Sequence, residues 1–254
     1  MQALQKDKAG MIVTGNKGNK NDNDSCSLIG KKQHDIAYIF DLDGTLLDSM
    51  GLWEEVDTQF LKKRGIIVTP TDYKKAILAM DFKEAAAYTI ARFGLRESAD
   101  EIMREWREAA VFAYGHTVRL KPYAIEYLKS LRALGAAMAV ATSLSADLYA
   151  PALHANGISG FFASVVSTSQ TKNGKTHPDV YLLAAKTLGA EPSDCIVFED
   201  ILAAVRSAKK AGMTVYAMYD SASDSDWPQM VKEADGAFRD FRHVPLPARL
   251  TNSS

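Results

Sequence analysis

The sequence predicts an α/β domain with a parallel sheet covered by helices on both faces, and a small all-helical unit inserted after the first strand. Two observations lead to this fold class. From residue 35 onward, short apolar runs rich in β-forming residues alternate with amphipathic stretches of helical spacing, which is typical of parallel sheets. Residues 50–120 break the alternation, because they contain helical patterns and no convincing strand.

The expected strands are short apolar runs, and the expected helices begin or end at Pro and Gly. We expect strands at Ile36–Phe40, Ala136–Ala141, Cys195–Phe198 and Met213–Met218, with a less strongly patterned one at Phe162–Val166. We expect helices at Pro122–Leu134, Pro178–Leu188 and Ala203–Ala211, each followed by a glycine that can end it. This succession predicts a Rossmann-like sheet.

Helical signals fill the inserted stretch. Trp53, Val56 and Phe60 form an apolar stripe that Gly65 closes. Thr69 before Pro70 has the pattern of a helix start, and Ser98 with Glu101 has the spacing of a capping box.

These patterns set the expected domain boundaries. The core domain comprises residues 35–49 and 121–240, and the helical cap domain comprises residues 50–120. Residues 1–34 are rich in Lys, Asn, Asp and Gly, so we expect a disordered leader, and we expect residues 241–254 to form a C-terminal tail.

Composition narrows the classes of partner. The 30 Lys and Arg residues nearly balance the 31 Asp and Glu residues, so no overall charge favours nucleic acid or an anionic membrane surface. No apolar run approaches the roughly 20 residues that span a bilayer. The chain has two cysteines, Cys26 in the polar leader and Cys195 in an apolar run, so we expect no structural disulfide. We expect a reducing, cytoplasmic location instead.

Two acids follow the first expected strand, in the sequence DLDGT. Side chains two positions apart in a strand share a face, so Asp41 and Asp43 can converge at the carboxyl end of the sheet, where open parallel sheets bind ligands. Taken alone, this motif is equally compatible with an Asp-Gly turn carrying two solvated acids.

Other expected strands also end in reactive side chains. Thr142 and Ser143 follow one strand, the adjacent acids Glu199 and Asp200 follow another, and Lys175 precedes the helix that begins at Pro178. Adjacent acids after a buried strand are costly unless a cation or a basic group balances them. The sequence therefore predicts acids, hydroxyls and a lysine at one edge of one sheet, rather than a solvated turn.

Each residue type suits phosphoryl transfer. A phosphate monoester repels an anionic nucleophile, so Mg²⁺ on oxygen ligands and a lysine can neutralise the charge. One carboxylate can form an aspartyl-phosphate, and a second can protonate the leaving oxygen and later activate water. Hydroxyl and backbone N–H groups can hold the phosphate oxygens.

DLDGT, a Thr-Ser pair at a strand end, Lys in KTHPD and then FED resemble the four ordered motifs of the haloacid dehalogenase superfamily. The chain looks most like the branch with a helical cap after the first motif, which holds phosphoglycolate phosphatase and β-phosphoglucomutase. The resemblance covers about Asp35 to Arg239. It implies a Mg²⁺-dependent phosphatase that acts on a small phosphorylated metabolite, of sugar phosphate, phosphoglycolate or nucleotide type.

The resemblance also implies residue roles. Asp41 would be the nucleophile and Asp43 the general acid and base. Thr142 and the backbone at Ser143 would bind the phosphoryl group, and Lys175 would neutralise its charge.

The same resemblance implies the metal ligands. Mg²⁺ would be held by the carboxylates of Asp41 and Asp200 and by the backbone carbonyl of Asp43. Glu199 would support the site beside Lys175 or behind the ligands.

Three other functions share part of this pattern. A sugar phosphomutase of the β-phosphoglucomutase type would use the same chemistry, but that pattern has a His five residues after the Asp that matches Asp48, and Trp53 stands there. A signalling receiver would place its acidic pair first and its Lys last, whereas here Lys175 precedes Glu199. The intact set of acids argues against an inactive metabolite-binding module.

Overall fold

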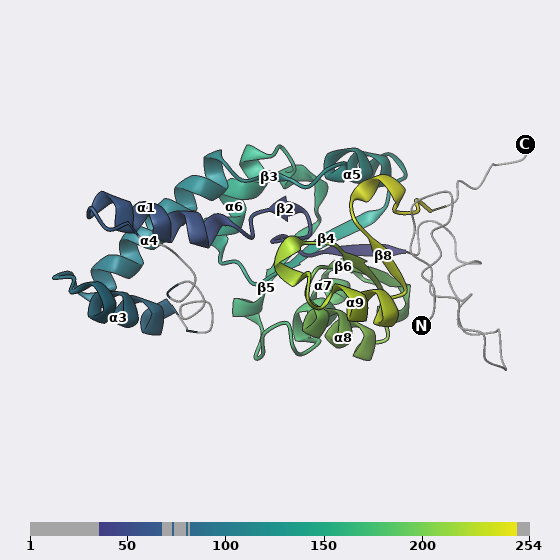
Figure 1. The fold of residues 1–254 in the computed structure, drawn as a ribbon. Helices are drawn as coiled ribbons and strands as arrows, with labels where there is room; N and C mark the ends of the chain where they lie inside the picture. Colours follow the sequence, from purple (N-terminus) through teal and green to yellow (C-terminus); the bar gives the residue numbers. More distant parts are fainter. Residues whose placement is uncertain (1–35, 68–72, 74–79, 81, 248–254) are drawn as a thin grey trace, which may run out of the picture. The chain divides into compact units, whose positions relative to one another are not determined.

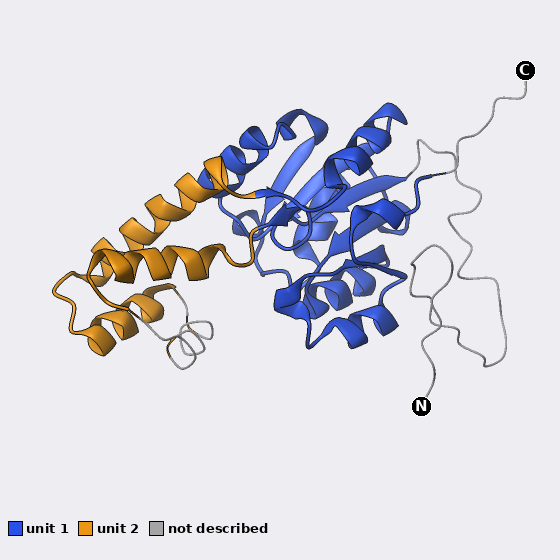
Figure 2. Cartoon of the chain, turned by 45° about the horizontal axis from the view of Figure 1, so that its top comes forward, with its two compact units in different colours: residues 1–48, 119–254 blue, residues 49–118 orange. Residues whose placement is uncertain are grey.

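The computed structural model describes residues 36–67, 73, 80 and 82–247. The described residues fall into two compact units, of which Ser49–Val118 is one and the chain on either side of it is the other (Figure 2). The expected leader and the expected helix start at Thr69 lie outside the described residues. Within the described residues, no helix has both the length and the apolar character needed to cross a bilayer.

The larger unit is built on a parallel sheet in the order β5-β4-β1-β6-β7-β8. Its strands are β1 (Ala37–Phe40), β4 (Ala137–Thr142), β5 (Ser164–Ser167), β6 (Cys195–Glu199), β7 (Thr214–Met218) and β8 (Gly236–Phe238). Strand β1 is central, with Ile39 opposite both Ala139 and Val197. Because both faces of β1 are covered, its residues are all buried, which explains the continuous apolar run. The predicted α/β fold class is confirmed.

Helices cover both faces of this sheet (Figure 1). They are α5 (Ala124–Ala133), α6 (Ala146–Ala155), α7 (Asp179–Leu188), α8 (Leu202–Lys210) and α9 (Trp227–Glu233). Helices α7, α8 and α9 pack on the face that carries Ile39 and Val197. On the other face, Tyr127 of α5 packs edge-on against Phe40 and Phe198, with ring centroids 6.4 and 5.7 Å away.

Some elements of the larger unit were not predicted. Helix α6 contains Pro151, and a proline inside a segment is a signal against a helix. Strand β8 has three residues and lies at the edge of the sheet, so it is too short to show an alternation. Helix α9 is short and begins among Ser and Asp residues that predict a loop.

The segment expected to be a tail starts inside the core. The turn η6 (Phe241–His243) buries Phe241, which is 2% exposed and whose ring centroid lies 5.5 Å from that of Tyr127. Val244 is also buried. The expectation that the tail begins at residue 241 is therefore wrong, because two isolated apolar residues without periodicity anchor this segment.

The smaller unit is helical, with α1 (Leu52–Lys63), α3 (Phe82–Phe93) and α4 (Ala99–His116). The predicted capping box is present: the Ser98 hydroxyl accepts from the Glu101 N–H, and the Glu101 carboxylate accepts from the Ser98 N–H. Arg119 and Leu120, which we expected in the helical unit, form β3 and pair with β2 (Leu47–Asp48) in the larger unit.

Candidate active site

The carboxyl ends of β1 and β6 place the acids side by side. Phe40 pairs with Phe198, and the Asp41 N–H donates to the Phe198 carbonyl at 3.1 Å, so the ladder extends one step beyond β1. Glu199 ends β6 and Asp200 follows it. Because neighbouring parallel strands end at the same edge, the acids after these two strands meet there.

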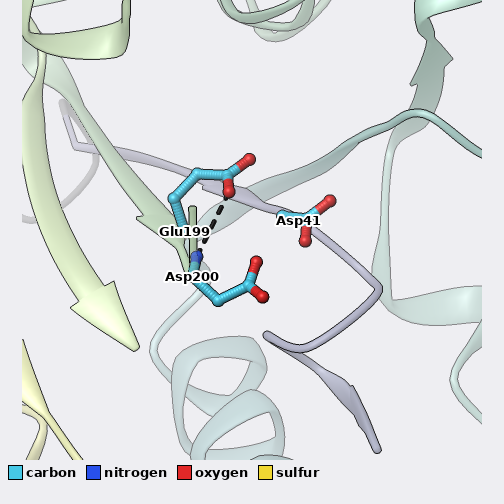
Figure 3. Close-up of side chains that lie close together, drawn as sticks. All are labelled: Asp41, Glu199 and Asp200. Atoms are coloured by element: carbon cyan, nitrogen blue, oxygen red, sulfur yellow. Dashed lines mark hydrogen bonds between the residues drawn. The ribbon is translucent and has the colours of Figure 1, made fainter. Parts of the chain in front are cut away.

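Asp41, Glu199 and Asp200 form a buried acidic cluster at this edge (Figure 3). One carboxylate oxygen from each residue lies within 4.8 Å of the others. The Thr45 hydroxyl donates to Asp200 Oδ1 at 3.4 Å. Asp200 Oδ2 is buried and has no hydrogen-bond partner among the described residues. A buried carboxylate oxygen without a donor is costly, so this edge of the sheet suits a bound cation.

Lys175 brings the buried positive charge to the cluster. Its ammonium forms ion pairs with Asp41 Oδ1 and, at 2.5 Å, with Glu199 Oε1. The Lys175 side chain is 10% exposed. Glu199 also accepts from the Tyr181 hydroxyl at 2.6 Å and from the Asp200 N–H at 3.2 Å. The lysine predicted from the sequence therefore contacts acids of both the first motif (Asp41) and the last motif (Glu199).

Among the residues that the structure describes, the charges in the cluster are not balanced, since three buried carboxylates lie around one ammonium. Burial raises the pKa of Asp41 to about 8, with Lys175 opposing the rise and the charges of Glu199 and Asp43 adding to it. Burial and the neighbouring acids also raise the pKa of Asp200. Although burial disfavours the ammonium, the facing Asp41 and Glu199 raise the pKa of Lys175. The chemistry of the donors and the unpartnered oxygen of Asp200 therefore fit a hard divalent cation.

The structure places Asp43 beside this cluster. Asp43 lies in the turn that follows β1, is half-buried, and is close enough for its charge to affect Asp41. The turn is closed by the Leu47 N–H, which donates to the Leu42 carbonyl at 2.7 Å, and by the Gly44 N–H, which donates to the Leu47 carbonyl at 2.9 Å. The backbone of this turn therefore fixes where the second Asp of the motif stands.

Thr142 and Ser143 lie at the end of the neighbouring strand β4. Thr142 is the last residue of β4 and is fully buried, and its hydroxyl accepts from the Leu144 N–H at 3.1 Å. Ser143 is exposed. Because β4 pairs with β1, both residues stand at the edge that carries Asp41. Their predicted phosphate-binding roles stay predictions.

Sequence reasoning gave no role to two residues that contact the acids. Thr45 belongs to the DLDGT motif, but a Thr after Gly in a turn carries no distinguishing signal of its own. Tyr181 lies on the apolar face of α7, where it reads as a core residue. A tyrosine on such a face, six residues after Lys175, still needs a partner for its hydroxyl, and that need was the available signal.

A parallel α/β sheet whose central strands end in an acidic cluster with a lysine suits an enzyme that acts on phosphate esters. Residues 38–218 match the haloacid dehalogenase-like hydrolase family. The chain belongs to this family, which confirms the resemblance seen in the sequence and the prediction that the protein is an enzyme.

Relatives share most of the chain's length. A probable pseudouridine-5'-phosphatase of Drosophila melanogaster is 30% identical over 83% of this chain and 94% of its own length. Hexitol phosphatase A of Escherichia coli is 32% identical over 72% of this chain and 82% of its own. The solved structure of a putative β-phosphoglucomutase from Thermotoga maritima is 26% identical and has a TM-score of 0.68, covering 73% of this chain and 86% of that one.

Proposed function

We propose that this protein hydrolyses the phosphate monoester of a small metabolite, with the Asp41 carboxylate as nucleophile. The observation that carries the proposal is the buried contact of Asp41 with Lys175 beside Glu199 and Asp200, in a chain of the haloacid dehalogenase-like family. A carboxylate held next to an ammonium can approach a phosphate dianion, because part of the repulsion is neutralised.

The reaction has two steps. In the first, an Asp41 oxygen forms a bond to phosphorus while the bond from phosphorus to the leaving oxygen breaks, and Asp43 gives that oxygen its proton. In the second, Asp43 takes a proton from water, the water oxygen bonds to phosphorus, and the bond to Asp41 breaks to release phosphate. Thr142, the backbone at Ser143 and Lys175 hold the phosphate oxygens through both steps.

The acid cluster would hold Mg²⁺ through the carboxylates of Asp41 and Asp200 and the backbone carbonyl of Asp43. When bound, the ion supplies positive charge against the cluster and the substrate phosphate. The unpartnered oxygen of Asp200 and the excess of carboxylates over ammonium support this assignment. Glu199 stays outside the ligand set, because Lys175, Tyr181 and the Asp200 N–H already occupy its oxygens.

The relatives narrow the substrate class. Their names refer to pseudouridine 5'-phosphate, hexitol phosphates and, in a Thermotoga maritima relative that is 26% identical over 74% of this chain, phosphorylated carbohydrates. We therefore place phosphorylated sugars, sugar alcohols and nucleosides first among the substrates. A cytoplasmic location belongs to the same proposal, and the buried free thiol of Cys195 supports a reducing compartment.

The test is phosphate release from a panel of phosphorylated metabolites with Mg²⁺, ranked by kcat/KM. Asp41→Asn is the matched control for every substrate, because it keeps the shape of the side chain and removes the nucleophile. A panel on which the wild type releases no more phosphate than Asp41→Asn would overturn the proposal.

A phosphomutase is the second candidate, since one similar solved structure bears that description. The structure places Trp53 in α1, 38% exposed and edge-on to Phe82 at 5.5 Å between ring centroids. An indole N–H donates but does not relay a proton, so we favour water as the acceptor of the phosphoryl group. Supplying β-glucose 1-phosphate with glucose 1,6-bisphosphate separates the two: glucose 6-phosphate formed faster than inorganic phosphate would make the protein a mutase.

A further inference from the structure

Tyr181 has a buried polar side chain and takes no part in the two proposed reaction steps. It lies in the first turns of α7 and is fully buried, on a helix face whose neighbouring core positions are Val180, Ala184 and Ala185. Its hydroxyl donates to Glu199 Oε1 at 2.6 Å. A phenylalanine would fill the same space without needing a partner, so the hydroxyl calls for an explanation beyond packing.

Three donors fix the carboxylate of Glu199. Lys175 and Tyr181 both donate to Oε1, at 2.5 and 2.6 Å, and the Asp200 N–H donates to Oε2 at 3.2 Å. Donors on both oxygens hold the plane of the carboxylate as well as its position. Burial and the charge of Glu199 raise the pKa of Tyr181, so the hydroxyl keeps its proton and remains a donor.

Tyr181 also meets Lys175 directly. The Lys175 ammonium lies 5.9 Å from the centroid of the Tyr181 ring, within the range of a cation–π contact. Lysine has a long side chain with many rotamers, so its ammonium needs several contacts to stay at one point. The ring of Tyr181, the carboxylate of Glu199 and the carboxylate of Asp41 supply them.

We propose that Tyr181 is a positioning residue for the reaction: through Glu199 and through its ring, it holds the Lys175 ammonium against Asp41. This inference rests on the proposed function, since Lys175 matters to the rate only if phosphoryl transfer takes place at Asp41. Without the hydroxyl, Glu199 loses one of its three donors, and Lys175 can follow the carboxylate away from Asp41. A small displacement of a catalytic charge lowers the rate much more than it lowers stability.

The kinetic test compares two changes at Tyr181 with a matched control. Tyr181→Phe keeps the ring and removes the hydroxyl. We expect kcat and kcat/KM to fall together by about tenfold, because the lost hydrogen bond to a charged group contributes to stabilising the transition state. Tyr181→Leu removes the ring as well and should be slower still. Tyr127→Phe removes another buried hydroxyl, which donates to the Pro245 carbonyl at 3.2 Å, and should leave kcat unchanged.

A double-mutant cycle tests whether Tyr181 acts through Glu199. Because both changes disturb the same group, Tyr181→Phe combined with Glu199→Gln should be no more than about twofold slower than Glu199→Gln alone. Independent, multiplying effects would overturn this route.

The remaining outcomes separate this inference from the proposed function. If the wild type is active and Tyr181→Phe keeps full kcat while its melting temperature falls, Tyr181 is structural and the inference is wrong, but the function stands. If the wild type releases no phosphate from any ester, the proposed function fails and this inference fails with it.

Discussion

Among the described residues of the larger unit, two lysines make buried ion pairs, and the pairs differ in how completely the charges around the lysine are matched. Lys121 forms an ion pair with Asp220, whose other oxygen accepts from the Ala222 N–H at 2.8 Å. Every oxygen of Asp220 therefore has a partner. Lys175 instead faces a cluster of three carboxylates, in which Asp200 Oδ2 has no donor among the residues that the structure describes.

The two pairs therefore differ in what they leave for a ligand to satisfy. The Lys121 pair joins the chain that follows β3 to the loop after β7, and the Lys121 N–H also donates to the Leu46 carbonyl at 2.8 Å. A matched pair of this kind holds loops and leaves nothing for a ligand to satisfy. The cluster at Lys175 keeps unmatched negative charge in a buried place, which costs stability; under the proposed function, a cation and a substrate would balance that charge.

Asp41→Asn, which changes the cluster at Lys175, should have the largest effect on turnover. We expect kcat to fall by roughly 10⁴-fold or more, because the change removes the proposed nucleophile. The melting temperature should stay within a few degrees of the wild type, since the change also removes one of the crowded negative charges and leaves Lys175 paired with Glu199. Phosphate release and calorimetry measure the two effects. Substantial turnover in the purified variant would exclude Asp41 as the nucleophile.

Asp220→Asn should have the opposite profile. It leaves the Lys121 ammonium without its carboxylate, and the side chains of the pair are 15% and 3% exposed. Breaking a buried pair in this way costs about 3 kcal/mol of unfolding free energy, the low end of the range because Lys121 still reaches some water. Urea unfolding measures this loss. The variant should keep kcat within a few-fold at a temperature where it is folded, and an inactive but stable variant would place Asp220 in the reaction.

The sequence was enough to predict that the acids at the strand ends would lie close together. Asp41, Glu199 and Asp200 follow buried runs, so the geometry of a parallel sheet brings them together whatever the helices do. Lys175 needed the order of the motifs, because it lies in a loop whose path no local pattern fixes. Tyr181 carried only the signal that a core tyrosine needs a hydrogen-bond partner; its partner could not be predicted, since the hydroxyl reaches Glu199 only after α7 has packed on the sheet.

In the fold, too, local sequence patterns predicted some elements and missed others. Strands with both faces covered are recognisable as apolar runs, and β1, β4, β6 and β7 were predicted to within one residue at each end. The edge strand β8 and the buried turn at Phe241 depend on tertiary contacts, such as the packing of Phe241 against Tyr127. Local pattern carries little information about segments that are held by partners distant in the sequence.

The effect of Mg²⁺ on the melting temperature should distinguish the cluster at Lys175 from the Lys121 pair without a measurement of activity. An ion that binds only the folded protein stabilises it by about 2.7 kcal/mol at a concentration 100 times its Kd, so the wild type should melt higher with Mg²⁺ than with EDTA. Asp200→Asn should lose most of that gain, and in EDTA it should be at least as stable as the wild type because a crowded charge is gone. Asp220→Asn is the control and should keep the full Mg²⁺ response. Equal responses in wild type and Asp200→Asn would exclude Asp200 as a ligand.

The smallest expected effect comes from removing both charges of the matched pair. Lys121→Met with Asp220→Asn leaves no buried ammonium, and the Asn oxygen can still accept from the Ala222 N–H. The remaining cost is the Asn amide without an acceptor, so the double variant should be about 1 kcal/mol less stable than the wild type, against about 3 kcal/mol for Asp220→Asn alone. A double variant as unstable as the single one would show that Asp220 acts through something other than Lys121. Applied to Lys175 and Asp41, the same pair of changes should give a folded protein without turnover, because in the proposed reaction both charges act on the substrate and neither Met nor Asn can replace them.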